Sequence, residues 1–172
     1  MFHVERVLKI PFYKRIMVIL TLFFTLQSCG LAKQAITIPD YILQPYGKEI
    51  IGKKNLTAFI FENNVTKIPL EQYLSAKFNT NNHSEKEYWV TIQNNKYKII
   101  IYDDAEFEKY FNSANYEVLN QIPQSGKNGD QRKFIAISVI NSYNEDCLAN
   151  ESLFQNIAVN HLRNLKNEYQ HQ

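Results

Sequence analysis

The sequence predicts an α+β fold, in which a mostly antiparallel sheet of about four strands packs with three helices in a single domain. Short runs rich in β-branched and aromatic residues indicate the strands. Longer segments with apolar residues at helical spacing indicate the helices. The two kinds of segment follow the order strand, helix, two-stranded hairpin, helix, strand, helix, which is typical of an α+β domain.

The first elements follow an extended segment. Residues 29–47 are expected to form a tether and an extended arm, because Pro39 and Pro45 disfavour a helix. Residues 56–61 read as a strand that ends at polar residues. A helix then begins at Pro69, since proline is tolerated in the first helical turn. Its buried face is formed by Leu70, Tyr73, Leu74 and Phe78.

Residues 87–101 predict a hairpin, since Tyr88, Val90 and Ile92 alternate with Trp89 and Thr91 before Asn94-Asn95, and an apolar segment from Tyr97 returns after it. Asparagine tolerates positive φ, so this pair is expected to form the tight turn. Asp103 and Glu106 have the spacing of a capping box and predict the start of the next helix.

The last elements are a strand and a long helix. Residues 121–132 are expected to form a polar loop. Residues 134–140 carry apolar side chains on both faces, which predicts a central strand. A final helix is expected over residues 151–169. Its apolar face contains Phe154, Ile157, Ala158, His161, Leu162, Leu165 and Tyr169.

The N-terminal residues have the pattern of a targeting segment. Basic residues precede an uncharged segment over residues 16–26, which is too short to span a bilayer as a helix. The segment ends at Leu26-Gln27-Ser28-Cys29. This ending resembles the signal of bacterial lipoproteins, with an aliphatic residue at −3 and a small residue at −1 of the cysteine. Gln27 departs from the small residue usual at −2.

The resemblance implies cleavage before Cys29 and lipidation of that cysteine. Residues 1–28 would then be a signal peptide, residues 29–47 a lipidated tether and arm, and residues 48–172 the globular domain. Gly30 replaces the aspartate that commonly retains lipoproteins in the inner membrane, so the resemblance favours the outer membrane, facing the periplasm. The alternatives are an ordinary signal peptide cut near Ser28 and an N-terminal amphipathic helix.

Removing residues 1–28 changes the charge balance. Lys plus Arg falls from 19 to 15 and Asp plus Glu from 17 to 16, because this segment carries Arg6, Lys9, Lys14, Arg15 and Glu5. The remaining 144 residues are therefore near −1 instead of +2. Nucleic-acid binding requires a basic stripe, and a near-neutral domain is not expected to provide one, so nucleic acid is not expected as a partner. The expected partners are the membrane, through lipid on Cys29, and a protein or envelope component.

Cys147 is the strongest candidate for chemistry. A position at or just before the start of the last helix would favour its thiolate, but Glu145 and Asp146 oppose ionisation. Three interpretations stay open: a buried structural cysteine, a reactive thiol and an intermolecular disulfide. His161 lies about 21 Å away along a continuous helix, at 1.5 Å per residue. We expect it to be a core residue bonded to a carbonyl.

No residue spacing predicts a metal site or another cofactor. The histidines and Cys147 lack the short spacings of zinc ligands, and the acidic residues after position 102 are explained by a helix cap. The abundant aromatic residues suggest an exposed recognition patch on the hairpin, because Tyr and Trp are enriched at protein interfaces. The candidate binding residues are Tyr88, Trp89, Tyr97 and Tyr102.

The sequence thus favours a non-enzymatic, lipid-anchored binding module of the cell envelope. One alternative is a thiol-dependent enzyme or redox protein that uses Cys147. The other is an immunity or inhibitor lipoprotein.

Overall fold

The computed structural model describes residues 35–50, 54–65, 68–80, 82, 84–120 and 132–172, together with residues 13, 16 and 17. Residues Ala35–Gln172 form one compact unit, to which the fold described below belongs. The predicted lipoprotein signal ending at Leu26–Cys29 lies outside the described residues, as do His83 and all but the last residue of the predicted 121–132 loop.

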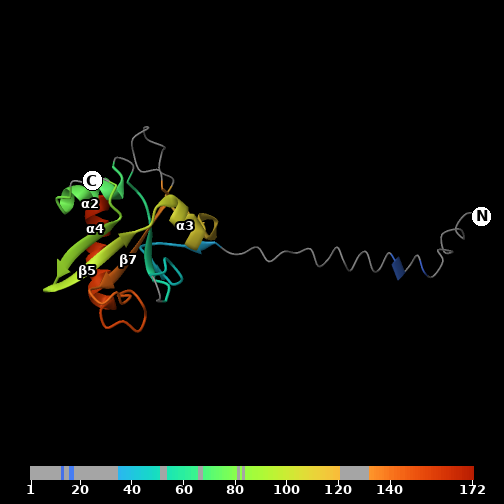
Figure 1. Cartoon of the computed structure of the whole chain (residues 1–172). Helices are drawn as coiled ribbons and strands as arrows, with labels where there is room; N and C mark the ends of the chain where they lie inside the picture. The colour runs from blue at the N-terminus through green and yellow to red at the C-terminus, as the bar shows by residue number, and fades with distance from the viewer. Residues whose placement is uncertain are drawn as a thin grey trace, which may run out of the picture. The chain divides into compact units, whose positions relative to one another are not determined.

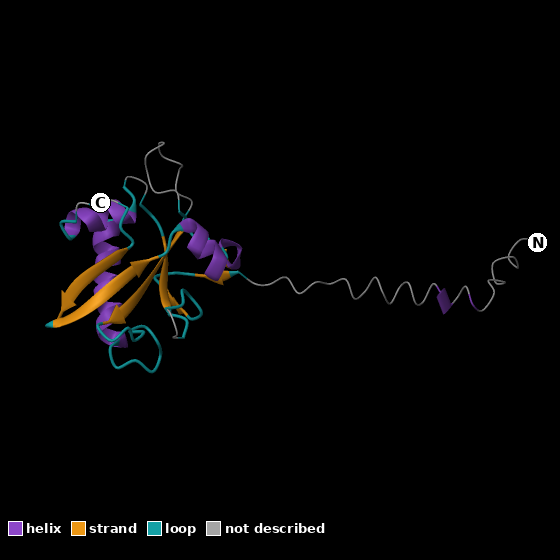
Figure 2. Cartoon of the chain, viewed as in Figure 1, coloured by secondary structure: helices purple, strands orange, loops and turns teal. Residues whose placement is uncertain are grey.

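The fold is α+β, with helix and strand mixed along the chain as predicted (Figures 1 and 2). The strands are β1 (Ile36–Thr37), β2 (Ile42–Gln44), β3 (Ala58–Glu62), β4 (Glu87–Ile92), β5 (Asn95–Ile101), β6 (Tyr116–Glu117) and β7 (Phe134–Asn141). The helices are α2 (Leu70–Lys77), α3 (Asp104–Tyr110), the 3₁₀ turn η1 (Ser113–Asn115) and α4 (Gln155–Gln170).

The main sheet has five antiparallel strands in the order β2-β3-β7-β5-β4. All eight residues of β7 are buried, which confirms the prediction of a central strand. The predicted extended arm contributes two strands. Its strand β2 forms one edge of the main sheet, and β1 pairs in parallel with β6.

Strand alternation divides the core into two layers. Phe59 and Phe61 of β3 belong to the same apolar cluster as residues of α2 and α4. Ala58 and Ile60 point to the opposite face, where they join Phe107 of α3. The sheet is therefore covered by α2 and α4 on one face and by α3 on part of the other.

The capping box is confirmed, because Asp103 accepts the N–H of Glu106 at 2.7 Å and Glu106 accepts the N–H of Asp103 at 3.2 Å. The predicted hairpin turn is wrong by one residue. Gln93 and Asn94 have φ of 48° and 63°, whereas Asn95 already pairs with Ile92. This register gives a two-residue turn, which suits the twist of the strands.

The arm is fastened to the domain at two places. Asp40 forms an ion pair with the buried ammonium group of Lys166 on α4, and a second one with Arg163 at 3.5 Å. Further along, Gly47 N–H donates to Leu56 O at 2.8 Å. A Cβ at Gly47 would collide with the Tyr102 hydroxyl and lie 2.9 Å from Leu56 O, so this close approach requires glycine.

Candidate functional site

The structure separates the four predicted binding aromatics. Tyr88, Tyr97 and Tyr102 are at most 2% exposed and belong to the core, whereas Trp89 is 54% exposed. The expectation of an exposed patch made of all four is therefore wrong for the three tyrosines. Strand alternation is the reason, because Tyr88 and Trp89 are neighbours on β4 and must point to opposite faces.

The buried tyrosines use their hydroxyl groups unequally. Tyr88 donates toward the carbonyls of Glu71 and Glu85. The Tyr102 hydroxyl accepts the N–H of Lys48 at 2.8 Å and pairs with Ser138 at 2.9 Å. The Tyr97 hydroxyl is buried and has no hydrogen-bond partner among the described residues. These groups build the core and its contact with the arm, not a recognition surface.

Cys147 does not begin the last helix, because α4 starts at Gln155. Its N–H donates to Val139 O at 2.9 Å, and its thiol donates to Glu145 O at 3.5 Å. The side chain is fully buried. Burial, and then the carboxylates of Asp146 and Glu145, raise the pKa of the thiol to about 12. A thiol held protonated in the core is a poor nucleophile.

His161 is half-buried on α4, and burial, followed by the charge of Lys77, lowers its pKa. Its Nε2 is buried without a hydrogen-bond partner in the described part of the chain, so this nitrogen does not make the expected bond to a carbonyl. Among the described residues, no group of three or more His, Cys, Asp or Glu side chains is placed to hold a metal ion.

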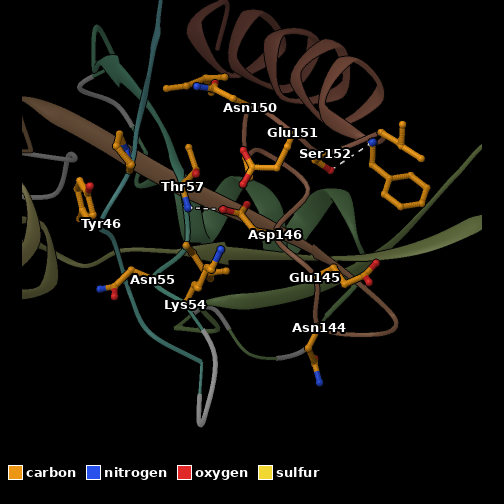
Figure 3. Close-up of a pocket in the computed structure, with 16 residues that line it drawn as sticks. Tyr46, Lys54, Asn55, Thr57, Asn144, Glu145, Asp146, Asn150, Glu151 and Ser152 are labelled. Atoms are coloured by element: carbon orange, nitrogen blue, oxygen red, sulfur yellow. Dashed lines mark hydrogen bonds between the residues drawn. The ribbon is translucent and has the colours of Figure 1, made fainter.

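A cleft of about 920 Å³ lies beside the edge strand β2. Three segments form it: the end of β2 and the residues after it, the residues before β3, and the 144–154 loop that precedes α4 (Figure 3). The lining residues are Leu43, Pro45, Tyr46, Lys54, Asn55, Leu56, Thr57, Asn144, Glu145, Asp146, Ala149, Asn150, Glu151, Ser152, Leu153 and Phe154.

Hydrogen bonds hold the walls of this cleft together. Asp146 accepts the N–H of Thr57 at 2.7 Å with one carboxylate oxygen and the N–H of Leu148 at 2.9 Å with the other (Figure 3 shows the first). At the start of the loop, the Asn141 side chain accepts the N–H groups of Tyr143 and Glu145. The 144–154 loop is therefore ordered by the domain without being helical.

Two large apolar side chains stand exposed at this cleft. Leu153 is 92% exposed and Tyr46 is 73% exposed. Tyr46 has φ of 69°, a left-handed conformation that is unfavourable for a bulky residue. Gly47 directly follows Tyr46, and the hydrogen bond from its N–H to Leu56 O holds the backbone in this conformation. Strain of this kind persists where the surrounding structure enforces it, and it is concentrated at functional sites.

The charged residues of the cleft are mainly acidic. Glu145 and Glu151 are exposed, Asp146 is half-buried, and Lys54 is the basic residue among those that line the cleft. No Ser, Cys or Thr among these lining residues has a histidine beside it, since no histidine lines the cleft. The cleft can therefore offer apolar contacts and negative charge to a bound group.

Sequence reasoning did not single out the exposed residues of the cleft. Leu153 lies next to Phe154 and reads as an extension of the helical stripe, and nothing in the sequence marks Tyr46 as strained.

The described part of the chain contains no helix that is long and apolar enough to cross a bilayer. Comparisons with family models, curated proteins and solved structures found no match for this chain.

Proposed function

We propose that the protein is a lipid-anchored, non-enzymatic binding module of the bacterial cell envelope. Cys29 carries the lipid and holds the protein in the outer membrane, facing the periplasm. The order of basic residues, short apolar segment, small residue and cysteine supports this anchor. The buried, protonated Cys147 gives no support to the thiol-dependent alternative.

The observation that carries the binding role is the exposure of Leu153 and Tyr46 on an ordered cleft. Full burial of a leucine side chain contributes about 1.5–3 kcal/mol, and aromatic residues are frequent anchors of interfaces. The ordering of the loop by Asp146 means that little conformational entropy is lost when a partner binds. The cleft therefore offers preorganised apolar contacts.

The charges of the cleft define the partner further. Carboxylates outnumber the ammonium group of Lys54 among the lining residues. The partner is a protein whose contact segment presents a lysine or arginine beside an apolar side chain, because complementary charge favours association and suppresses wrong partners. If this partner is a toxin or a hydrolase, the protein acts as an immunity or inhibitor lipoprotein.

Site-specific photo-crosslinking in intact cells tests this function. A photoreactive amino acid replaces Leu153 in one variant and Tyr46 in another. A control variant carries it at Asn164, an exposed residue of α4 that does not line the cleft. We expect one discrete adduct from both cleft positions and none from Asn164. The adduct is identified by mass spectrometry.

Charge reversal sharpens this experiment. Glu151→Lys is expected to weaken the adduct from position 153, because it opposes the basic segment of the partner, and Asn164→Lys is expected to leave it unchanged. No adduct at either cleft position, or the same adduct at Asn164, would contradict the proposal. An adduct that survives Glu151→Lys and Glu145→Lys together would refute the basic character of the partner.

A further inference from the structure

The two edges of the main sheet differ in how well they are protected from pairing with another strand. Edge strand β2 has three residues and is followed directly by Pro45, which cannot donate a backbone hydrogen bond. Edge strand β4 has six residues and contains no proline, glycine or lysine. Natural proteins commonly protect an edge strand from pairing by making it short or by placing proline at it, as β2 does. Strand β4 has neither feature, so it is the more open edge of this sheet.

The register of the hairpin shows which backbone groups of β4 face outward. Ile92 pairs with Asn95 across the two-residue turn, so Ile92, Val90 and Tyr88 exchange hydrogen bonds with β5. Lys86 continues this series, because its carbonyl accepts the N–H of Ile101 at 2.8 Å. The N–H and C=O groups of the intervening residues therefore point away from β5. These residues are Glu87, Trp89 and Thr91.

No strand pairs with the outer side of β4 in the described part of the chain, since β4 ends the strand order of the sheet. Figure 2 shows the hairpin projecting from the sheet to its turn at the lower left, with β4 as the outer strand. The side chains of β4 that lie on the face away from α2 and α4 are exposed, and Trp89 is the largest of them.

We propose that β4 is a dimerisation edge and that its occupant is β4 of a second copy of this chain. Antiparallel pairing centred on Trp89 places Trp89 opposite the Trp89 of the other copy and Glu87 opposite its Thr91. All three outward residues then lie in hydrogen-bonded pairs, with about six main-chain hydrogen bonds between the copies. The two five-stranded sheets become one continuous sheet.

Strand length favours this register over its neighbours, because sliding one strand by two residues leaves either Glu87 or Thr91 of each copy opposite a residue outside β4. A larger slide that brings Glu87 opposite the Glu87 of the other copy places like charges in a direct cross-strand pair, which is unfavourable. In the proposed register each Glu87 faces a neutral threonine. Lys98 lies over the Trp89 ring at 5.1 Å and forms an ion pair with Glu87 of its own chain at 2.9 Å. Glu87 is therefore already paired with a lysine of its own chain when it meets the Thr91 of the other copy.

This edge is separate from the cleft, because no residue of β4 lines it. A single strand pair is small compared with a standard interface of about 1,600 Å², so we expect a dimer that depends on protein concentration. If the protein does not dimerise, the proposed binding function of the cleft is unaffected. If the cleft binds no partner, the proposed dimer is unaffected.

The test compares Thr91→Pro with Thr91→Val in the full chain in detergent, by sedimentation and light scattering up to about 1 mM protein. The Thr91 N–H points away from β5, so proline at this position removes a hydrogen bond between the copies and leaves the hydrogen bonds between β4 and β5 in place. We expect dimers for the native chain and Thr91→Val, and a folded monomer for Thr91→Pro. A native chain that stays monomeric, or a Thr91→Pro chain that dimerises as strongly, would overturn the proposal.

Cysteine crosslinking provides a second measurement that does not depend on how proline is tolerated. The background is Cys29→Ser, and Cys147 is buried. Trp89→Cys places two thiols on the axis, where Cα atoms of a hydrogen-bonded pair lie about 5.5 Å apart, within disulfide range. Thr91→Cys places them more than about 13 Å apart. We expect a disulfide-linked dimer only from Trp89→Cys. Equal crosslinking of both variants, or none, would overturn this register.

Discussion

Asp146 accepts a hydrogen bond from the backbone N–H of Thr57, 89 positions away in the chain. The bond joins the loop before α4 to the residue that precedes β3, and the same carboxylate accepts the N–H of Leu148. One side chain therefore holds two walls of the candidate cleft. In the sequence Asp146 is notable only as a neighbour of Cys147, yet its carboxylate bonds the backbone of a distant segment directly before β3.

Replacing Asp146 by alanine is expected to lower the free energy of unfolding by about 2–4 kcal/mol. Hydrogen bonds to a charged group contribute about 1.5–3 kcal/mol each, and the backbone N–H of Thr57 would lose its partner in a part-buried site. Urea unfolding measures the change. Glu151→Ala is the control, because an exposed side chain at this cleft is expected to change stability by less than about 0.5 kcal/mol. Equal effects of the two substitutions would contradict the structural role of Asp146.

Asp40→Ala is expected to destabilise the domain more than Lys166→Met. Asp40→Ala leaves the buried ammonium group of Lys166 without its carboxylate, whereas Lys166→Met removes the buried charge itself. We expect a cost of about 2–3 kcal/mol for the first and about 1 kcal/mol or less for the second. Chemical denaturation of both variants and of the double variant measures these costs. A larger cost for Lys166→Met would show that the pair stabilises the fold through its charges.

Gly47→Ala is expected to cost about 1–3 kcal/mol, the usual penalty for overpacking a close contact. The new Cβ meets the Tyr102 hydroxyl and the backbone oxygen of Leu56, and a backbone atom has little freedom to move. The thermal midpoint of unfolding measures the effect. Gly47→Ala combined with Tyr102→Phe should cost less than the sum of the single changes, because phenylalanine lacks the hydroxyl that the new Cβ meets. Strict additivity would contradict the clash.

Stability is expected to fall as the pH rises from about 9 to about 12, in part because of Cys147. Its pKa is raised from 9.0 to about 12 in the folded protein, so the folded state retains the proton over this range while the unfolded state releases it. The stabilisation is present below pH 9 and is lost as the pH rises toward 12. Burial also raises the pKa of Tyr88 and Tyr116 to about 12, so these groups add to the slope.

Cys147→Ala isolates the contribution of the thiol. Its unfolding free energy should depend less steeply on pH above 9 than that of the native chain, and the two slopes should agree below pH 8. In the folded native chain, maleimide should not modify Cys147 at neutral pH until denaturant is added. Rapid modification of Cys147 without unfolding would restore the thiol-dependent alternative.

Local patterns predicted the elements that depend on local physics. The two apolar faces of residues 134–140 located the central strand β7, and Asp103 with Glu106 located the start of α3. The start of α4 was placed too early. Ser152 and Gln155 donate to loop carbonyls, at Ala149 and Leu148 respectively, in turns that a hydrophobic period does not reveal.

The candidate site depended on distant contacts and was harder to predict. The cleft joins three segments, and its two exposed apolar residues owe their positions to loop geometry. The backbone of Tyr46 is held by the hydrogen bond from Gly47 N–H to Leu56 O, which the sequence does not indicate. The burial of Tyr88 was predictable, because strand alternation places it on the same face as Val90 and on the other face of the strand from Trp89. The number of aromatic residues in the hairpin does not by itself indicate which of them are exposed.

The intact mass of the protein extracted from cell membranes tests the proposed anchor at Cys29 most directly. We expect the mass of residues 29–172 plus acyl groups, and we expect Cys29→Ser to abolish both the acylation and the membrane association. Maturation without lipid, or a chain that retains residues 1–28, would contradict the anchor and with it the proposal of a membrane-held binding module.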